Sequence, residues 1–315
     1  MPAIKVSELA YCRFQVPDLD IAEQFLTDFG LIPLGREGDC RYFRGTDAAP
    51  YCYVIQQGPT QFLGFAFHAK SREDLDLLAE DQRLPVETID APGGGFRVRL
   101  KEPGGYDVDV VYGIQPEPPI KVTRQLSNTG AQPLLRKGEL FRQKRGDATP
   151  LKRLAHVVLG SPDVHGSVTW FHTTLGMISS DEVFAGPEKK FLGAFIRVDD
   201  GDAFVDHHAL FVIASPVAGL HHVSFESQDI DAVLADHHYL KSLNRYEHMW
   251  GIGRHLLGSQ VFDYWSDPHG YSHEHWADSD RLNSGAATNQ WDASEGMVTQ
   301  WGEEPPESVR NCVRL

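Results

Sequence analysis

Histidine is unevenly distributed along this sequence. The 315 residues include 15 histidines, and eleven of these lie between His207 and His275. This is more clustering than an ordinary protein surface would show. Imidazole is suited to metal coordination and to proton transfer near neutral pH. The second half of the chain is therefore expected to hold a site that uses one or both of these properties.

Three residues of the second half could hold a metal ion together: His156, His222 and Glu274. They are separated by 66 and 52 residues, and each is expected on a strand. Two neutral imidazoles and one carboxylate on one face of an octahedral site are the ligand set of non-haem Fe(II) oxygenases, which leaves positions open for substrate and oxygen. Zinc hydrolases can use the same residue types, so ligand identity alone leaves the metal open.

The strand and helix pattern around these residues occurs twice, which indicates a duplicated structure. In each half, a segment that alternates like a strand reaches Pro-Asp, a turn and helix-cap signal, and continues into a helical pattern that ends at Gly. A second strand and helix follow, and then a tight turn that leads into another strand. The equivalent segments are 9–18 and 154–163, 62–67 and 220–225, and 102–109 and 267–274.

The repeat makes the three candidate ligands more informative than any one of them alone. A single histidine beside a strand is usually hydrogen-bonded in the core or at the surface. At the equivalent places, however, the first half carries Tyr11, Gly64 and Asp109. The fold is repeated while the ligand set is not, as expected if one domain is specialised for metal binding.

We predict an α+β protein of two domains, each made of two βαβββ modules whose strands form an open, cup-shaped mixed sheet around a site. The first domain spans 1–145 and binds no metal, and an irregular connector covers 115–150. The second domain spans 146–315, carries the metal site and ends in a tail. Because the tail contains Trp291 and Trp301, we expect it to pack against the body of the protein.

Residues 253–274 form a specific motif. In order, it reads Gly253-Arg254-His255, Tyr264, Asp267-Pro268-x-Gly270 and Glu274. This arrangement resembles the signature of the type I extradiol catechol dioxygenases of the vicinal oxygen chelate superfamily, and the two-domain repeat extends the resemblance over nearly the whole chain. Members of that family usually carry an apolar residue immediately before the tyrosine, where this chain has Asp263. The difference suggests an outlying subgroup.

The resemblance implies the vicinal oxygen chelate fold and an extradiol ring-cleaving dioxygenase that uses Fe(II), or less often Mn(II). Such an enzyme inserts both atoms of O2 into a substituted catechol next to its diol, in the aerobic degradation of aromatic compounds. By this resemblance His156, His222 and Glu274 would bind the metal. Tyr264 would hydrogen-bond the substrate oxygen or the carboxylate side of the site, and His255 would line the substrate pocket.

The resemblance also implies an acid–base histidine on a strand upstream of the second ligand, where this chain has residues 206–210. We assign this role to His207, with His208 as the alternative beside the substrate, because imidazole titrates near neutral pH. Two other histidines, His237 and His238, fall within a predicted helix and are expected to be solvated.

Two further residues are expected near the substrate. Val158 lies two positions after the first ligand on the same face of a strand and should sit beside the oxygen site. Trp250, Trp265 and Trp276 flank the motif and could line an aromatic pocket or belong to the core. We assign Trp250 to the pocket.

Two other functions are compatible with the same fold. A glyoxalase-like isomerase or lyase, or a zinc hydrolase, would also use a metal. The glyoxalase type normally needs a fourth protein ligand, which Tyr11 and Gly64 do not obviously supply. A non-catalytic small-molecule-binding protein would have no use for a complete ligand set.

Composition limits the partners. The chain has 44 acidic and 29 basic side chains and a formal net charge of −15, which disfavours nucleic acid and anionic lipid. No apolar run approaches the roughly 18 residues of a membrane span, so we expect a cytoplasmic protein. The free strand edges of open sheets favour a homo-oligomer. The particular catechol and the ring bond that is cleaved are not determined by the sequence.

Overall fold

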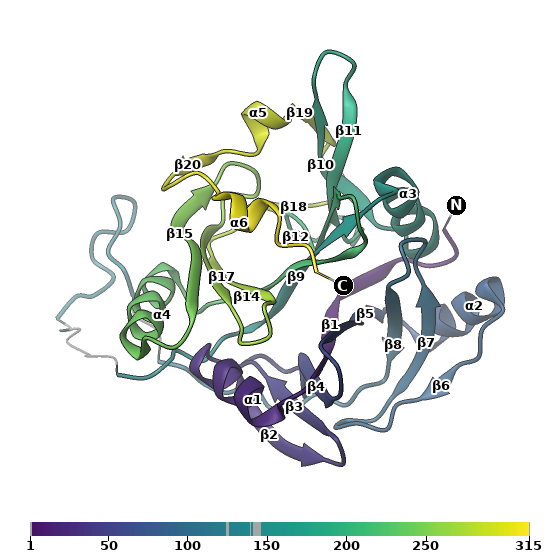
Figure 1. Ribbon diagram of the computed structural model, residues 1–315, viewed down its shortest axis with the longest axis horizontal. Helices are drawn as coiled ribbons and strands as arrows, with labels where there is room; N and C mark the ends of the chain where they lie inside the picture. Colours follow the sequence, from purple (N-terminus) through teal and green to yellow (C-terminus); the bar gives the residue numbers. More distant parts are fainter. Residues whose placement is uncertain (1, 124–125, 139, 141–145, 315) are drawn as a thin grey trace.

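The computed structural model describes residues 2–123, 126–138, 140 and 146–314. It contains two large mixed sheets and few helices, which confirms the predicted α+β class. Each sheet belongs to one half of the chain, and the two halves lie side by side (Figure 1). The predicted domain boundary at residue 145 falls in the stretch 141–145, outside the described residues.

The first half forms an eight-stranded sheet from two βαβββ modules. Its strand order is β2-β3-β4-β1-β5-β8-β7-β6, and the modules meet where β1 and β5 pair in antiparallel fashion. The elements are β1 (Val6–Val16), α1 (Leu19–Asp28), β2 (Ile32–Glu37), β3 (Cys40–Arg44), β4 (Tyr53–Gln57), β5 (Gln61–Ala69), α2 (Arg72–Gln82), β6 (Glu87–Thr88), β7 (Phe96–Lys101) and β8 (Asp107–Tyr112).

The second half repeats this arrangement in a ten-stranded sheet of order β19-β10-β11-β13-β9-β14-β17-β16-β15-β20. Its modules meet where β9 and β14 pair in antiparallel fashion. The module elements are β9 (Arg153–Ser161), α3 (Val164–Leu175), β10 (Ile178–Ala185), β11 (Lys190–Arg197), β12 (Val205–Asp206), β13 (Leu210–Ala214), β14 (Gly219–Glu226), α4 (Ile230–Leu243), β15 (Glu247–His255), β16 (Val261–Ser266) and β17 (Ser272–Ala277).

The C-terminal segment adds strands to both edges of this second sheet. β19 pairs with β10 and β20 pairs with β15, while β18 pairs with β12 in a separate two-stranded sheet. The expectation that the tail packs against the body is therefore confirmed. Its elements are β18 (Arg281–Leu282), β19 (Asn289–Asp292), α5 (Ala293–Gly296), β20 (Thr299–Trp301) and α6 (Glu307–Arg310).

Local sequence signals explain where the first helix of each half begins. Asp18 caps α1 by accepting hydrogen bonds from the backbone N–H groups of Asp20 and Ile21, and Asp163 caps α3 by accepting one from Gly166. These are the predicted Pro-Asp caps, which satisfy helix N–H groups that lack an intrahelical partner. Gly176 ends α3 with a φ of 66°, a conformation that glycine adopts without a Cβ clash.

Strand register shows that the two halves are structurally equivalent residue by residue. Arg13 lies opposite Gly64 across β1 and β5, and Val158 lies opposite His222 across β9 and β14. Asp109 lies opposite Ala66 on parallel strands, just as Glu274 lies opposite Ser224. The repeat inferred from sequence therefore aligns the correct positions on all three strands that carry candidate ligands.

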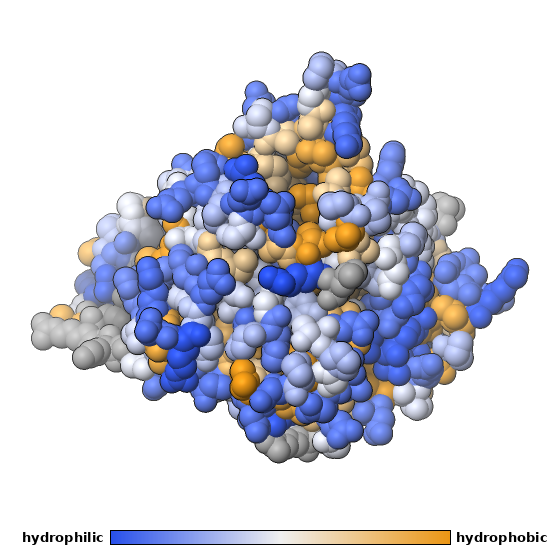
Figure 2. All heavy atoms as spheres, in the orientation of Figure 1, coloured by the Kyte–Doolittle hydropathy of each residue, from blue (hydrophilic) through white to orange (hydrophobic). Residues whose placement is uncertain are grey.

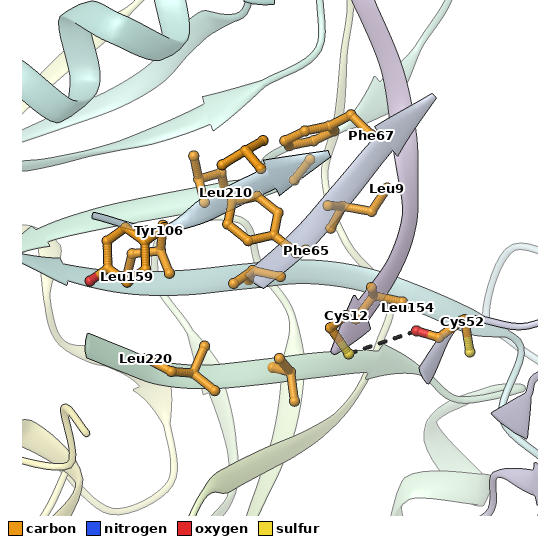
Figure 3. Close-up of a cluster of buried hydrophobic side chains, with 14 of the residues drawn as sticks. Leu9, Cys12, Cys52, Phe65, Phe67, Tyr106, Leu154, Leu159, Leu210 and Leu220 are labelled. Atoms are coloured by element: carbon orange, nitrogen blue, oxygen red, sulfur yellow. Dashed lines mark hydrogen bonds between the residues drawn. The ribbon is translucent and has the colours of Figure 1, made fainter. Parts of the chain in front are cut away.

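One hydrophobic core joins both halves. Figure 3 shows side chains of the first half, such as Phe65 and Phe67, packed with Leu159, Leu210 and Leu220 of the second. Within this core, the Cys12 Sγ donates a hydrogen bond to the backbone carbonyl of Cys52, and neither cysteine forms a disulfide. The shared core gives the two sheets a fixed relative position. None of the helices in the described ranges is long and apolar enough to cross a membrane.

Candidate metal centre and substrate cavity

His156, His222 and Glu274 lie together on the three adjacent strands β9, β14 and β17. His156 Nε2 is 2.9 Å from Glu274 Oε2, His222 Nε2 is 3.4 Å from the same oxygen, and the two Nε2 atoms are 3.4 Å apart. All three residues are buried. Alternation along a strand turns every second side chain to one face, and the register places these three on the same face.

The electrostatics of the cluster suit a cation. Burial lowers the pKa of His222 to about 4, so this imidazole is neutral at pH 7. Burial alone would raise the pKa of Glu274, but the nearby His156 and His222 hold it well below its usual range. Neither oxygen of Glu274 receives a well-directed hydrogen bond in the described residues, although both are fully buried.

These donors fit a divalent metal ion. Cis ligands of an octahedral ion with bonds of about 2.1 Å lie roughly 3.0 Å apart, close to the spacing of these three atoms. An uncompensated buried carboxylate is unfavourable unless a cation or donors neutralise it. Among the described residues, this cluster offers three candidate protein ligands. A glyoxalase-type site would need a fourth, which the cluster does not include.

The two histidines proposed for acid–base chemistry have different surroundings. His208 lines the cavity beside the cluster, with its ring centroid 4.3 Å from that of His156. His207 lies behind it, with Nδ1 3.1 Å from His208 Nδ1 and Nε2 2.6 Å from Asp181 Oδ2. The geometry therefore favours the alternative, His208, over the first choice, His207, for contact with substrate.

Asp181 is a residue that sequence reasoning missed. It lies on β10, and its Oδ1 accepts a hydrogen bond of 2.9 Å from Trp291 Nε1 of the tail. Burial opposes ionisation of Asp181, but hydrogen bonds from His207 and Trp291 lower its pKa overall. No short-range pattern indicates this contact, because the three residues come from distant segments of the chain.

Tyr264 and His255 lie on the opposite side of the candidate ligands. The Tyr264 hydroxyl is 3.1 Å from His255 Nε2, which is 3.4 Å from Glu274 Oε1. Both residues line the cavity, as do Val158 and Trp250. The other two tryptophans of the motif region, Trp265 and Trp276, are instead buried in the protein interior.

The cavity above the ligands has a volume of about 520 Å³, within the usual range for small-molecule sites. Much of its wall is apolar, and the C-terminal segment closes one side with residues such as Met297 and Val309. Figure 2 shows hydrophobic surface in the hollow between the β10–β11 hairpin and this segment.

His221 also lines the cavity, with Nδ1 2.7 Å from His222 Nδ1. Sequence reasoning missed it, although the His221-His222 pair was a visible signal.

The equivalent place in the first half is filled by protein charges. The Tyr11 hydroxyl donates to Asp109 Oδ2 at 2.9 Å, and Arg99 Nε donates to Asp109 Oδ1 at 2.8 Å. Register places Arg99 where the second half has Tyr264, and Gly64 offers no side chain where the second half has His222. The guanidinium thus supplies the positive charge that neutralises this buried carboxylate.

Asp109→Ala should leave the metal content of the protein unchanged, because its carboxylate is paired with Arg99. The variant should lose about 1–3 kcal/mol of stability, since removal of a buried ionic acceptor leaves the Tyr11 hydroxyl and Arg99 without their partner. Metal analysis and urea unfolding would test both expectations. A halved metal stoichiometry would mean that the first half also binds an ion.

Comparison with known proteins supports the resemblance inferred from the motif. No family model matches the chain. Metapyrocatechase 2 of Cupriavidus necator is 30% identical to it, over 98% of this chain and 93% of that protein. The chain belongs to the extradiol catechol dioxygenases. The predicted family and ring-cleaving activity are therefore confirmed, and the non-catalytic alternative is set aside.

Solved structures show the fold of this dioxygenase. The Mn(II)-bound glyoxalase of Novosphingobium aromaticivorans superposes with a TM-score of 0.78 at 23% identity, over 96% of this chain and 94% of that one. Homoprotocatechuate 2,3-dioxygenase of Brevibacterium fuscum, solved with 3,4-dihydroxyphenylacetate, gives 0.76 at 20% identity, over 98% and 92%. The predicted vicinal oxygen chelate fold is confirmed by these likenesses.

Proposed function

We propose that this dioxygenase holds Fe(II) between His156, His222 and Glu274 and cleaves a substituted catechol beside its two hydroxyl groups. The observation that carries the proposal is the buried cluster of two imidazoles and one carboxylate at the wall of a largely apolar cavity. This donor set is typical of non-haem Fe(II) oxygenases, and it leaves coordination positions for substrate and oxygen. Mn(II) is the second metal to compare, since it accepts the same donors.

The bound metal would supply charge stabilisation of the deprotonated diol and a place for O2 beside the ring. The protein must then move protons. Burial lowers the pKa of His208 well below its ordinary value, so this side chain is neutral at pH 7 and one of its ring nitrogens is unprotonated. One of its ring nitrogens, Nδ1, contacts His207, which leaves Nε2 for the substrate.

Tyr264 and His255 would bind the substrate oxygen from the other side of the site. Burial and the nearby Glu274 raise the pKa of Tyr264 well above its ordinary value, so its hydroxyl keeps the proton and can donate it in a hydrogen bond. His255 is held 3.1 Å from that hydroxyl. A hydrogen-bond donor fixed at this position would stabilise negative charge on the catechol oxygen next to it. That oxygen would then be more ionised than the other one.

The cavity wall favours a catechol with an apolar substituent. Aliphatic and aromatic residues on β9, β11, β13 and the turn after β15 surround the space next to the candidate ligands, and burying apolar substrate surface against them is favourable. These residues are Val158, Phe195, Phe211, Ile213, Leu256 and Leu257. We assign substrate binding and chemistry to 146–315 and a scaffold role to 1–145.

The test is anaerobic loading with Fe(II), followed by air and a panel of alkyl, aryl and carboxylated catechols. Cleavage beside the diol should give a yellow, conjugated product absorbing between roughly 350 and 450 nm. We expect the highest kcat/KM for an alkyl or aryl catechol. Parallel loading with Mn(II) and with no metal provides the controls. One bound iron per chain with no product from any catechol would contradict the proposal.

A further inference from the structure

A second group of potential metal ligands lies outside the cavity. His237 on α4, His248 on β15 and Asp263 on β16 bring their donor atoms within 4.8 Å of one another, and we call these three residues the outer cluster. Asp263 is the residue at which the motif departs from its family. Contrary to the sequence-based expectation, His237 is buried, whereas its neighbour His238 is exposed.

The outer cluster lies on the opposite face of the sheet from the catalytic residues. Tyr264 lines the cavity, so the next residue back along β16, Asp263, points to the other face. There it meets α4, which packs against β16. The cluster is therefore separate from the site formed by His156, His222 and Glu274.

The geometry directs both imidazoles at one carboxylate oxygen. His237 Nδ1 and His248 Nε2 are each 2.9 Å from Asp263 Oδ1. The other oxygen, Oδ2, accepts a hydrogen bond of 2.6 Å from Trp265 Nε1. A hydrogen bond of this kind fixes the orientation of a ligating carboxylate.

A glycine lies next to the carboxylate of Asp263. Gly251 lies opposite Asp263 on β15 with a φ of 124°, and a Cβ built there would be 2.9 Å from Asp263 Oδ1. Any other residue at 251 would fill the volume next to the oxygen that both histidines face. The side chain of His248 is 22% exposed, so the outer cluster lies close to the protein surface.

The charge of the cluster favours a cation. Asp263 is fully buried, and among the described residues its only ionic partners are the two histidines. A buried carboxylate is costly inside a protein unless hydrogen-bond donors or a cation balance its charge. A dication with an affinity for imidazole and carboxylate would neutralise it.

We propose that His237, His248 and Asp263 bind a Zn²⁺ ion that joins α4 to the strands carrying His255 and Tyr264. Tetrahedral ligands with bonds of about 2.0–2.1 Å lie roughly 3.3 Å apart. The two contacts of 2.9 Å therefore need to open by only a few tenths of an ångström. A water molecule would complete the four ligands. Because the outer cluster does not line the cavity, the ion would link α4 to β15 and β16 and take no part in ring cleavage.

The test is zinc stoichiometry of the full-length protein after dialysis, measured in a two-by-two set of variants. Wild type should bind about two zinc ions, because Zn²⁺ also fills the catalytic ligands, and His248→Gln should bind about one. The same loss should occur in a Glu274→Ala background. Zinc titration should raise the Tm of Glu274→Ala by several degrees, but not that of the double variant.

The matched control is His238→Gln, which removes the exposed histidine next to His237 on the same helix. This variant should keep the full zinc content, whereas His248→Gln should weaken the outer site by at least about 100-fold. Equal zinc content in wild type and His248→Gln would overturn the proposal, as would an equal loss in His238→Gln. Suppose that His248→Gln alone loses one zinc ion, but the double variant Glu274→Ala, His248→Gln still retains one. That result would contradict the proposed catalytic ligand set and leave the outer site intact.

Discussion

Glu274→Ala should abolish metal binding at the catalytic site and ring cleavage together. The carboxylate is the only anionic member of the proposed ligand set, and its Oε2 atom lies 2.9 Å from His156 Nε2 and 3.4 Å from His222 Nε2. Its removal leaves two imidazoles and no anionic ligand, a set that holds a divalent ion weakly. Loss of a direct ligand should exceed the roughly 10–100-fold cost of losing an outer-shell partner.

Iron content after desalting and turnover of the best catechol are the two measurements. The repeat supplies a matched control, because Asp109 occupies the same register position in the first half and is equally buried. Asp109→Ala should lower stability but keep iron and turnover, so a general loss of folding can be separated from loss of the ligand. Full activity of Glu274→Ala with one iron per chain would reject Glu274 as a ligand.

His208→Gln should retain iron and lower kcat by about 10²–10⁴-fold, the usual contribution of a positioned acid or base. Glutamine can still form hydrogen bonds but cannot accept and return a proton near pH 7. The affinity for metal should change little, because His208 packs against His156 without being one of the three proposed ligands. Single-turnover measurements with iron-loaded protein would separate this effect from substrate binding.

His207→Gln tests the other assignment at the same time. His207 contacts His208 and Asp181 but does not line the cavity, so its loss should act through the orientation of His208. We expect a smaller reduction of kcat, about 10–100-fold. Asp181→Asn should give a similar reduction, because it removes the carboxylate that contacts His207 Nε2. A larger effect of His207→Gln than of His208→Gln would restore His207 as the acid–base residue.

The repeated architecture could be predicted from sequence because its signals are local. Strand alternation and the Pro-Asp caps at Asp18 and Asp163 recur at corresponding places, and each depends on residues a few positions apart. Helix α4 was also expected, but the environment of His237 was not. Burial of a helix face depends on which strands pack against it, and here that partner is Asp263 of β16.

The sequence by itself determined the family, the repeat and the three candidate ligands, since spacing along strands fixes which residues can share a face of a sheet. Only the tertiary structure decided that His208 faces the cavity while His207 turns toward Asp181. Neighbouring residues on a chain point in different directions, and which one meets the site depends on distant partners such as Trp291. The outer cluster has the same origin, because three separate elements must pack before its donor atoms meet.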